Sequence, residues 1–143
     1  MARLVVDASV VVKWFIEEES SKEARRLRDD YASDLVDLEA PSLLPFEVLN
    51  AIRFSGLFSP GELRRVAEAL DAFAIPARPL EGSLAAASMT MASSAGLTVY
   101  DASYIALAKE LGATLFTADR GLLKATKGLG LVAHIDTYGT PND

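Results

Sequence analysis

The chain has 143 residues and a formal net charge of −6, with no cysteine and one histidine. This composition excludes disulfide frameworks, zinc fingers and thiol nucleophiles, and the acidic balance argues against broad electrostatic affinity for nucleic acid. Half of the residues are hydrophobic, which is typical of a globular domain. The sequence shows no signal-peptide pattern, and no apolar run approaches the roughly 18 residues of a membrane span, so we expect a soluble, cytoplasmic protein without membrane contact.

Strands and helices alternate along the first half of the chain. Residues 3–7 form an apolar, β-branched run that predicts a buried strand. Two serines, each followed by glutamate three residues later, have the spacing of a capping box and predict helix starts at Ser20 and Ser59. The other elements expected here are helices over residues 9–15, 20–31, 46–54 and 60–73 and a short strand over residues 37–40.

The second half continues this alternation. Residues 75–80 contain two prolines and predict a strand at the edge of the sheet. An apolar stripe that begins at Tyr104 and ends before Gly112 predicts a helix with Asp101 at its N-terminus, where an N-cap is the simplest role for that side chain. The other predictions are helices over residues 83–95 and 120–126 and strands over residues 114–117 and 130–135.

Strands that alternate with helices imply right-handed crossovers between parallel strands. We therefore expect an α/β fold, a three-layer sandwich with a mostly parallel sheet of about five strands flanked by helices. The chain shows no internal repeat, low-complexity block or linker. We predict one domain over residues 1–138 and a C-terminal tail over residues 139–143.

Acidic residues follow the predicted strands at the points where ligands bind in parallel α/β sheets. Asp7 and Asp119 each end an apolar strand, and Asp101 opens a helix. The carboxyl ends of parallel strands share one edge of the sheet, so these acids are expected to converge there. Glu47 joins them as a charge that is out of pattern in a largely apolar helix, although a position on a narrow polar edge of that helix is the alternative.

Such a group of carboxylates favours a divalent cation. Two carboxylates about 5 Å apart repel each other by roughly 3 kcal/mol at an effective dielectric constant of 20. A site with oxygen ligands only prefers Mg²⁺ or Mn²⁺ to zinc. A metal held in this way activates water and stabilises charge on a phosphodiester, so the pattern indicates phosphoryl chemistry.

Four short motifs in this order resemble the PIN domain family, and within it the VapC-type toxin ribonucleases of toxin–antitoxin pairs. The motifs span nearly the whole chain. They are Val5-Val6-Asp7-Ala8-Ser9-Val10, Glu47-Val48-Leu49-Asn50, Tyr100-Asp101-Ala102-Ser103-Tyr104-Ile105-Ala106-Leu107-Ala108 and Thr117-Ala118-Asp119-Arg120. The resemblance implies a metal-dependent endoribonuclease that cleaves RNA, forms a homodimer and is bound by a cognate VapB-like antitoxin.

The resemblance also assigns site residues. It implies that the metal-binding acids are Asp7, Glu47, Asp101 and Asp119. In the mechanism that we expect, Asp7, Asp101 and Asp119 hold Mg²⁺ or Mn²⁺. Glu47 or Asp119 orients or deprotonates the attacking water. The positions that support these acids are Ser9, Asn50 and Thr117. Leucines at positions 122 and 123 stand where many relatives carry a further acid, which weakens the case for a second metal site.

Several residues near the acids have two interpretations. Lys13 and Arg120 are candidates for phosphate contacts, although solvated surface charge is the more usual role. Trp14 can stack on a base but more often belongs to a core or an interface. Tyr100 and Tyr104 border Asp101 and are expected to be packing residues, and the lone histidine, at position 134, is expected to be structural.

Other functions compete with this interpretation. A phospho-aspartyl hydrolase needs a second acid two residues after its nucleophile, where this chain has Ser9. A Mg²⁺-binding receiver module needs an acidic pair at the first strand and a lysine after the last strand, and neither is present. A PIN domain that only binds RNA or a partner, and a PIN nuclease of RNA processing or quality control, remain as alternatives within the family.

Overall fold

A computed structural model describes residues 1–141, and the last two residues of the predicted tail lie outside the described part. Five strands form one sheet in the order β3-β2-β1-β4-β5, and every neighbouring pair is parallel. The strands are β1 (Ala2–Val6), β2 (Val36–Pro41), β3 (Ala77–Arg78), β4 (Thr114–Thr117) and β5 (Val132–His134).

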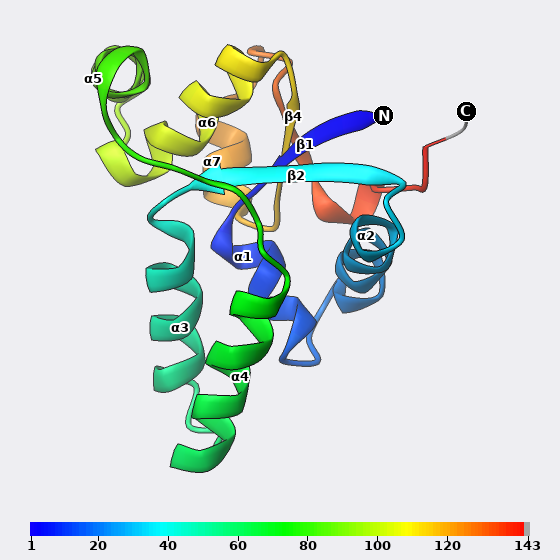
Figure 1. Ribbon diagram of the computed structural model, residues 1–143. Helices are drawn as coiled ribbons and strands as arrows, with labels where there is room; N and C mark the ends of the chain where they lie inside the picture. The colour runs from blue at the N-terminus through cyan, green and yellow to red at the C-terminus, as the bar shows by residue number, and fades with distance from the viewer. Residues whose placement is uncertain (142–143) are drawn as a thin grey trace.

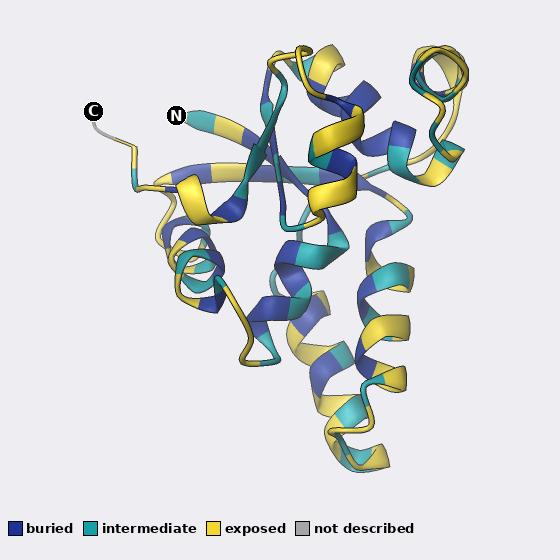
Figure 2. Cartoon of the chain, turned by 180° about the vertical axis from the view of Figure 1, so that it is seen from behind, coloured by how far each residue is buried: buried dark blue, intermediate teal, exposed yellow. Residues whose placement is uncertain are grey.

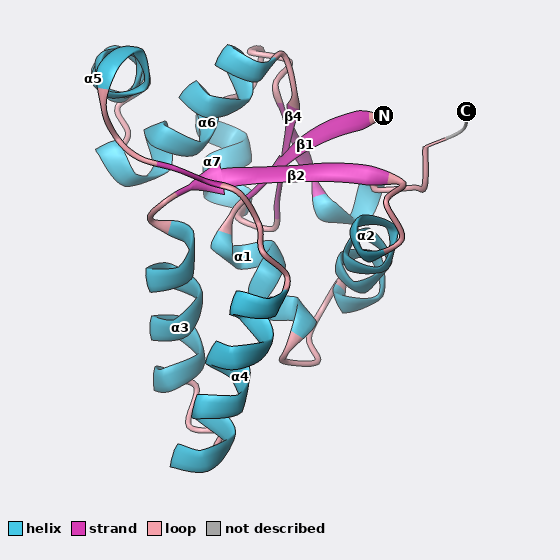
Figure 3. Cartoon of the chain, viewed as in Figure 1, coloured by secondary structure: helices cyan, strands magenta, loops and turns pink. Residues whose placement is uncertain are grey.

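Helices cover both faces of this sheet and confirm the predicted three-layer α/β architecture (Figure 1). In that view α5 and α6 lie above the strands, whereas α1, α2, α3 and α4 lie below them, and Figure 3 shows the same layers by secondary structure. The α-helices are α1 (Ala8–Val11), α2 (Ser21–Ala32), α3 (Leu44–Phe54), α4 (Pro60–Ala72), α5 (Gly82–Ala95), α6 (Val99–Leu111) and α7 (Arg120–Ala125), and the 3₁₀ turns are η1 (Val12–Trp14) and η2 (Ile135–Thr137).

The strand order places a topological switch point beside the central strand. From β1 the chain adds β2 and β3 on one side, and later β4 and β5 on the other side. The chain therefore leaves the carboxyl ends of β1 and β4 toward different parts of the fold. Ligands of open α/β sheets bind at such a switch point.

The core lies on both faces of β1 and around α6. Val5 and Val6 of β1 are fully buried, and every residue of α6 from Ala102 to Ala108 is buried. A helix that is apolar on all sides must be covered on all sides. The sheet covers one side of α6, and α5 packs on another side. The two helices approach closely because the side chains of α5 are mostly small. Figure 2 shows the buried residues along the strands and the inward sides of the helices.

One of the two predicted capping boxes is present. At Ser59 the side chain accepts a hydrogen bond from the Glu62 amide, and the Glu62 side chain accepts one from the Ser59 amide. The predicted helix start at Ser20 is confirmed, since α2 begins at Ser21, but the capping box predicted there is absent. Ser20 has φ +65° and makes no capping bond, because the loop before α2 is closed instead by Ser21, whose hydroxyl bonds Glu18 N and Ile16 O.

Two other elements differ from the prediction. The edge strand β3 has only two residues, because the prolines at positions 76 and 79 bracket it and cannot donate ladder hydrogen bonds. The helix expected over residues 9–15 divides into α1 and the 3₁₀ turn η1. None of the helices within residues 1–141 has the length and apolarity needed to cross a bilayer.

Candidate active site

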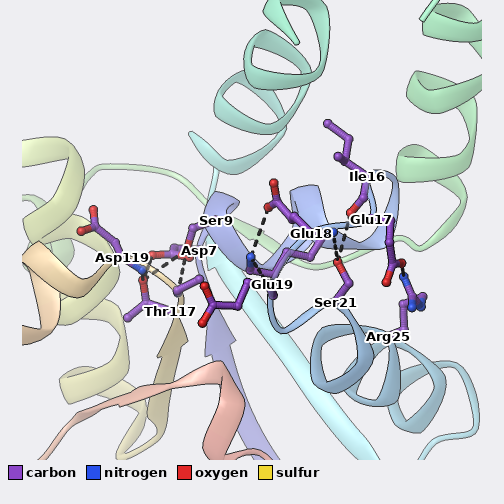
Figure 4. Close-up of polar contacts among 12 residues, drawn as sticks. Asp7, Ser9, Ile16, Glu17, Glu18, Glu19, Ser21, Arg25, Thr117 and Asp119 are labelled. Atoms are coloured by element: carbon purple, nitrogen blue, oxygen red, sulfur yellow. Dashed lines mark hydrogen bonds and ion pairs between the residues drawn. The ribbon is translucent and has the colours of Figure 1, made fainter. Parts of the chain in front are cut away.

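Asp7 lies directly after the central strand and is the most buried of the predicted acids, with 7% of its surface exposed. Its backbone amide continues the sheet by donating to Phe116 O of β4. The Ser9 hydroxyl donates to Asp7 Oδ1 at 2.5 Å, and the Thr117 hydroxyl donates to Oδ2 (Figure 4). Both carboxylate oxygens are therefore fixed by hydroxyls from the two strand ends that border the switch point.

These two hydroxyls also shape the loop after β4. Ser9 Oγ accepts a hydrogen bond from the Ala118 amide at 2.8 Å, and Thr117 Oγ1 accepts one from the Asp119 amide at 3.0 Å. The two oxygens lie 3.3 Å apart. Ser9 and Thr117 thus join the ends of β1 and β4, and place Asp119 beside Asp7.

The environment of Asp7 disfavours its negative charge. The pKa of the Asp7 carboxyl is raised to about 6. Burial is the main cause and the nearby charge of Asp119 contributes, while the hydrogen bonds from Ser9 and Thr117 act in the opposite direction. An opposite charge close to a buried carboxylate would favour its ionised form. The site is therefore electrostatically suited to a cation.

Asp101 is not the N-cap of its helix, as the sequence suggested. Helix α6 begins at Val99, and the cap is Thr98, whose hydroxyl accepts a hydrogen bond from the Asp101 amide at 3.1 Å. The spacing Thr98-x-x-Asp101 is compatible with a cap at Thr98, but Asp101 is also a residue type that caps helices. Burial raises the pKa of the Asp101 carboxyl, and the charge of Asp119 adds to the effect.

Asp119 is the N-cap of the following helix, α7. It precedes α7, and its Oδ1 accepts a hydrogen bond from the Leu122 amide at 3.0 Å. Asp119 is exposed, and its charge raises the pKa values of both Asp7 and Asp101. Asp119 is therefore the exposed acid close to both Asp7 and Asp101.

Glu47 reaches the same region from α3. It lies in the first turn of that helix and is half-buried, and its Oε1 accepts a 2.6 Å hydrogen bond from the hydroxyl of Tyr104 on α6. Burial raises the pKa of Tyr104 well above its usual range, and the bond to Glu47 and the charges of Glu47, Asp7 and Asp101 add to this shift. The Tyr104 hydroxyl thus lies amid the predicted acids, a contact that the sequence pattern did not reveal.

The charges of the predicted acids reach one another in part. The charge of Asp119 raises the pKa values of Asp7 and Asp101, and the charges of Glu47, Asp7 and Asp101 raise the pKa of Tyr104. Within residues 1–141, however, no three acidic, histidine or cysteine side chains lie close enough to hold a metal ion together. Glu47 and Asp119 each have one oxygen engaged by a partner of its own, Tyr104 and the Leu122 amide. The assignment of metal ligands therefore stays a prediction.

The candidate phosphate contacts differ in their surroundings. Lys13 is buried, and its Nζ donates to Glu18 Oε1 at 3.2 Å and to the Glu19 carbonyl at 2.5 Å. Arg120 is exposed and lies 3.7 Å from the Glu19 carboxylate. In Figure 4 Glu19 lies on the side of Thr117, whereas Glu17 lies away from Asp7 and pairs with Arg25. Asn50 is exposed on α3, one turn after Glu47.

The remaining residues that the sequence singled out are mostly structural. Trp14 is a core residue, as expected: its indole nitrogen donates to Ala24 O at 2.8 Å, and its ring lies 5.0 Å from that of Phe73. The histidine at position 134 caps η2 by accepting a hydrogen bond from the Asp136 amide. The packing role expected for Tyr100 is wrong, because it is 62% exposed on the outer side of the first turn of α6.

Comparison with known proteins identifies the fold and the family. A family model described as the PIN domain matches residues 4–128. Ribonuclease VapC3 from Pyrobaculum aerophilum is 34% identical over 125 residues, which cover 84% of this chain and 92% of that protein. The crystal structure of PAE2754 from Pyrobaculum aerophilum is similar with a TM-score of 0.64 and 25% identity, covering 95% of this chain and 92% of that chain.

A toxin–antitoxin complex from Klebsiella pneumoniae shares the fold at 16% identity, with a TM-score of 0.68 over 92% of this chain and 97% of that chain. The family model covers most of this sequence, and the VapC3 relative is matched over nearly its whole length. The resemblance inferred from the four motifs is therefore confirmed, and this chain belongs to the PIN domain family.

Proposed function

We propose that this protein is a VapC-type endoribonuclease, the toxin of a toxin–antitoxin pair, and that it hydrolyses RNA phosphodiesters with the help of a divalent cation. The observation that carries the proposal is the position of Asp7 at the switch point of a PIN fold, where Ser9 and Thr117 hold its carboxylate. The relative VapC3, which is matched over 84% of this chain, is a ribonuclease by name and supports the same activity.

The residues at this site fit Mg²⁺ or Mn²⁺. The donors are carboxylate oxygens, which these hard cations prefer, and burial of Asp7 leaves a negative charge that a cation would stabilise. Asp7, Asp101 and Asp119 are the residues that would hold the ion. When bound, such an ion supplies an activated water and stabilises negative charge on the phosphodiester.

The chain's own residues have separable tasks in this proposal. Ser9 and Thr117 fix the Asp7 carboxylate in one orientation. Glu47, in the first turn of α3, orients the attacking water or accepts its proton through a carboxylate oxygen. Arg120, which is exposed beside Asp119, contacts the phosphate backbone of the RNA.

The partners that we propose are an RNA substrate, a VapB-like antitoxin and a second copy of the chain. Structural relatives include toxin–antitoxin complexes, which supports an antitoxin partner. A groove with the exposed apolar side chains Phe46, Leu80 and Tyr100 at its border is a suitable surface for a homodimer. We also propose that residues 1–138 act as one domain, and that the protein works in the cytoplasm, where RNA is available.

The direct test is cleavage of total RNA followed by sequencing of the new ends. The purified protein is incubated with RNA in Mg²⁺, in Mn²⁺ or in EDTA, beside an Asp7→Asn variant. We expect discrete cleavage sites with either metal, and none with EDTA or with the variant. Cleavage by Asp7→Asn equal to that of the wild type would overturn the proposed site, and no cleavage by the wild type under any metal condition would overturn the function.

A further inference from the structure

The hydroxyl of Tyr104 connects two helices that carry predicted acids. Tyr104 lies three residues after Asp101 on α6, and it donates a 2.6 Å hydrogen bond to Glu47 Oε1 on α3, 57 positions away in the sequence. The tyrosine is only 2% exposed. Because the ring is enclosed, the hydroxyl cannot exchange Glu47 for bulk water without displacement of the side chain.

Packing alone does not explain a tyrosine at this position. Phenylalanine has the same ring and would fill the same space, whereas a buried phenol needs a hydrogen-bond partner. The partner here is a carboxylate, and the charges of Asp7 and Asp101 also act on this hydroxyl. The polar end of Tyr104 therefore points into the acid cluster rather than toward the apolar core.

The bond restricts a side chain that is otherwise mobile. Glutamate has several rotamers, and repulsion from nearby carboxylates drives a half-exposed glutamate toward solvent. A buried donor that binds Oε1 selects one orientation of Glu47. Among residues 1–141, Tyr104 is the one side-chain hydrogen-bond partner of Glu47, so Oε2 stays available to water or to a ligand.

We propose that Tyr104 is a positioning residue for Glu47. It holds Oε1 and thereby keeps the second carboxylate oxygen in the acid cluster, where Glu47 handles the attacking water. This inference rests on the proposed ribonuclease function and extends it to a residue outside the four acids. Residues behind the reacting groups of metal sites typically change activity or metal affinity by roughly 10- to 100-fold when they are altered.

The test compares Tyr104→Phe with a matched control, Tyr138→Phe. Tyr138 is also buried, and its hydroxyl also donates a 2.6 Å hydrogen bond to a carboxylate, Asp30 Oδ2 on α2. Each variant loses one hydrogen bond from a phenol to a carboxylate, but only Tyr104→Phe loses it at one of the four predicted site acids. The measurements are kcat and KM for an RNA oligonucleotide that contains a mapped cleavage site, and calorimetric binding of Mn²⁺ alone.

We expect Tyr104→Phe to lower kcat by roughly 10- to 100-fold with KM and Mn²⁺ affinity little changed, and Tyr138→Phe to leave kcat unchanged. A wild-type kcat in Tyr104→Phe, or equal losses in both variants, would overturn the inference. If the wild type cleaves and only this comparison fails, the proposed function stands. If the wild type does not cleave RNA at all, the proposed function fails and this inference fails with it.

A second measurement does not depend on cleavage. Denaturation midpoints of Tyr104→Phe, Glu47→Ala and the double variant form a cycle that isolates the interaction between the two side chains. We expect the effects to be non-additive, with little further change from Tyr104→Phe once Glu47 is removed. Strictly additive midpoints would mean that the two side chains are not coupled, and would overturn the positioning role.

Discussion

Two carboxylates are buried within residues 1–141, and a comparison between them separates a site from a structural contact. Asp7, at the end of β1, is 7% exposed, and Asp30, in α2, is 8% exposed. Both are held by hydroxyl groups, Asp7 by Ser9 and Thr117 and Asp30 by Tyr138. Burial and hydrogen bonding therefore do not distinguish them.

The charged neighbours of Asp7 and Asp30 distinguish the two carboxylates. Asp7 lies at the switch point of the sheet, and Asp119 and Tyr104 connect it electrostatically to Asp101 and Glu47. Asp30 instead closes the C-terminal segment onto α2 through its bond to Tyr138. A buried acid that gathers other acids at a ligand-binding edge points to cation chemistry, whereas a buried acid with one phenol donor is explained by folding alone.

The largest expected difference between the two regions is in cleavage. Asp7→Asn keeps the size of the side chain and one acceptor oxygen, but it replaces the other oxygen with an NH2 donor and removes the charge that would hold a cation. We expect the cleavage rate to fall by more than the roughly 100-fold typical of residues behind metal ligands. The measurement is the single-turnover rate with Mn²⁺, with circular dichroism as the control for folding, and a loss below tenfold would contradict the assignment of Asp7.

The pH dependence of stability gives a second difference. The pKa of Asp7 is raised from 3.8 to about 6, so the folded state binds the Asp7 proton more tightly than the unfolded state does. This contribution to stability is fully present below pH 3.8 and is lost as pH rises through about 6, which amounts to about 3 kcal/mol. Asp7→Asn lacks it.

Urea unfolding between pH 4 and 7 in EDTA measures this contribution as the difference between wild type and Asp7→Asn. The difference removes the contributions of groups common to both proteins, including Asp101, whose pKa is also raised by burial. We expect the wild type to lose stability relative to the variant as pH rises. Parallel curves for the two proteins would show that the Asp7 carboxyl is not destabilised by burial.

Removal of the donors sharpens the comparison further. Thr117→Val and Tyr138→Phe each delete a hydroxyl that donates to a buried carboxylate. Each is expected to lower the free energy of unfolding by about 1–3 kcal/mol, because a buried acceptor loses its partner. Only Thr117→Val is expected to slow cleavage, and equal cleavage by both variants would remove the distinction between the two regions.

The sequence predicted the fold and the neighbourhood of the site well, because both depend on local patterns. Apolar β-branched runs that end in Asp7 and Asp119 mark strand ends, and alternation with helices implies a parallel sheet whose carboxyl ends share one edge. The edge strand was also recognisable, since its prolines cannot take part in a full ladder.

The sequence-based predictions failed where contacts between distant residues select one of several possible caps or hydrogen bonds. Ser20 has the spacing of a cap, but the loop closed by Ser21 puts it in a left-handed conformation. Asp101 and Thr98 are both acceptable caps, and the sequence alone does not rank them. The bond between Tyr104 and Glu47 joins residues 57 positions apart on different helices, so it leaves no periodic signal in the sequence.

The smallest expected effect belongs to Asp30→Asn, and it is the strictest test of the comparison. Asparagine keeps an oxygen that accepts the Tyr138 hydrogen bond, so the contact between α2 and the C-terminal segment survives. We expect the free energy of unfolding to change by less than about 1 kcal/mol and the cleavage rate to stay unchanged. The same substitution at Asp7 removes the negative charge from a cluster that depends on it. If Asp30→Asn also abolishes cleavage while the unfolding midpoint is unchanged, the proposed distinction is wrong. The reaction would then depend on a buried acid in general and not on the acids close to Asp7.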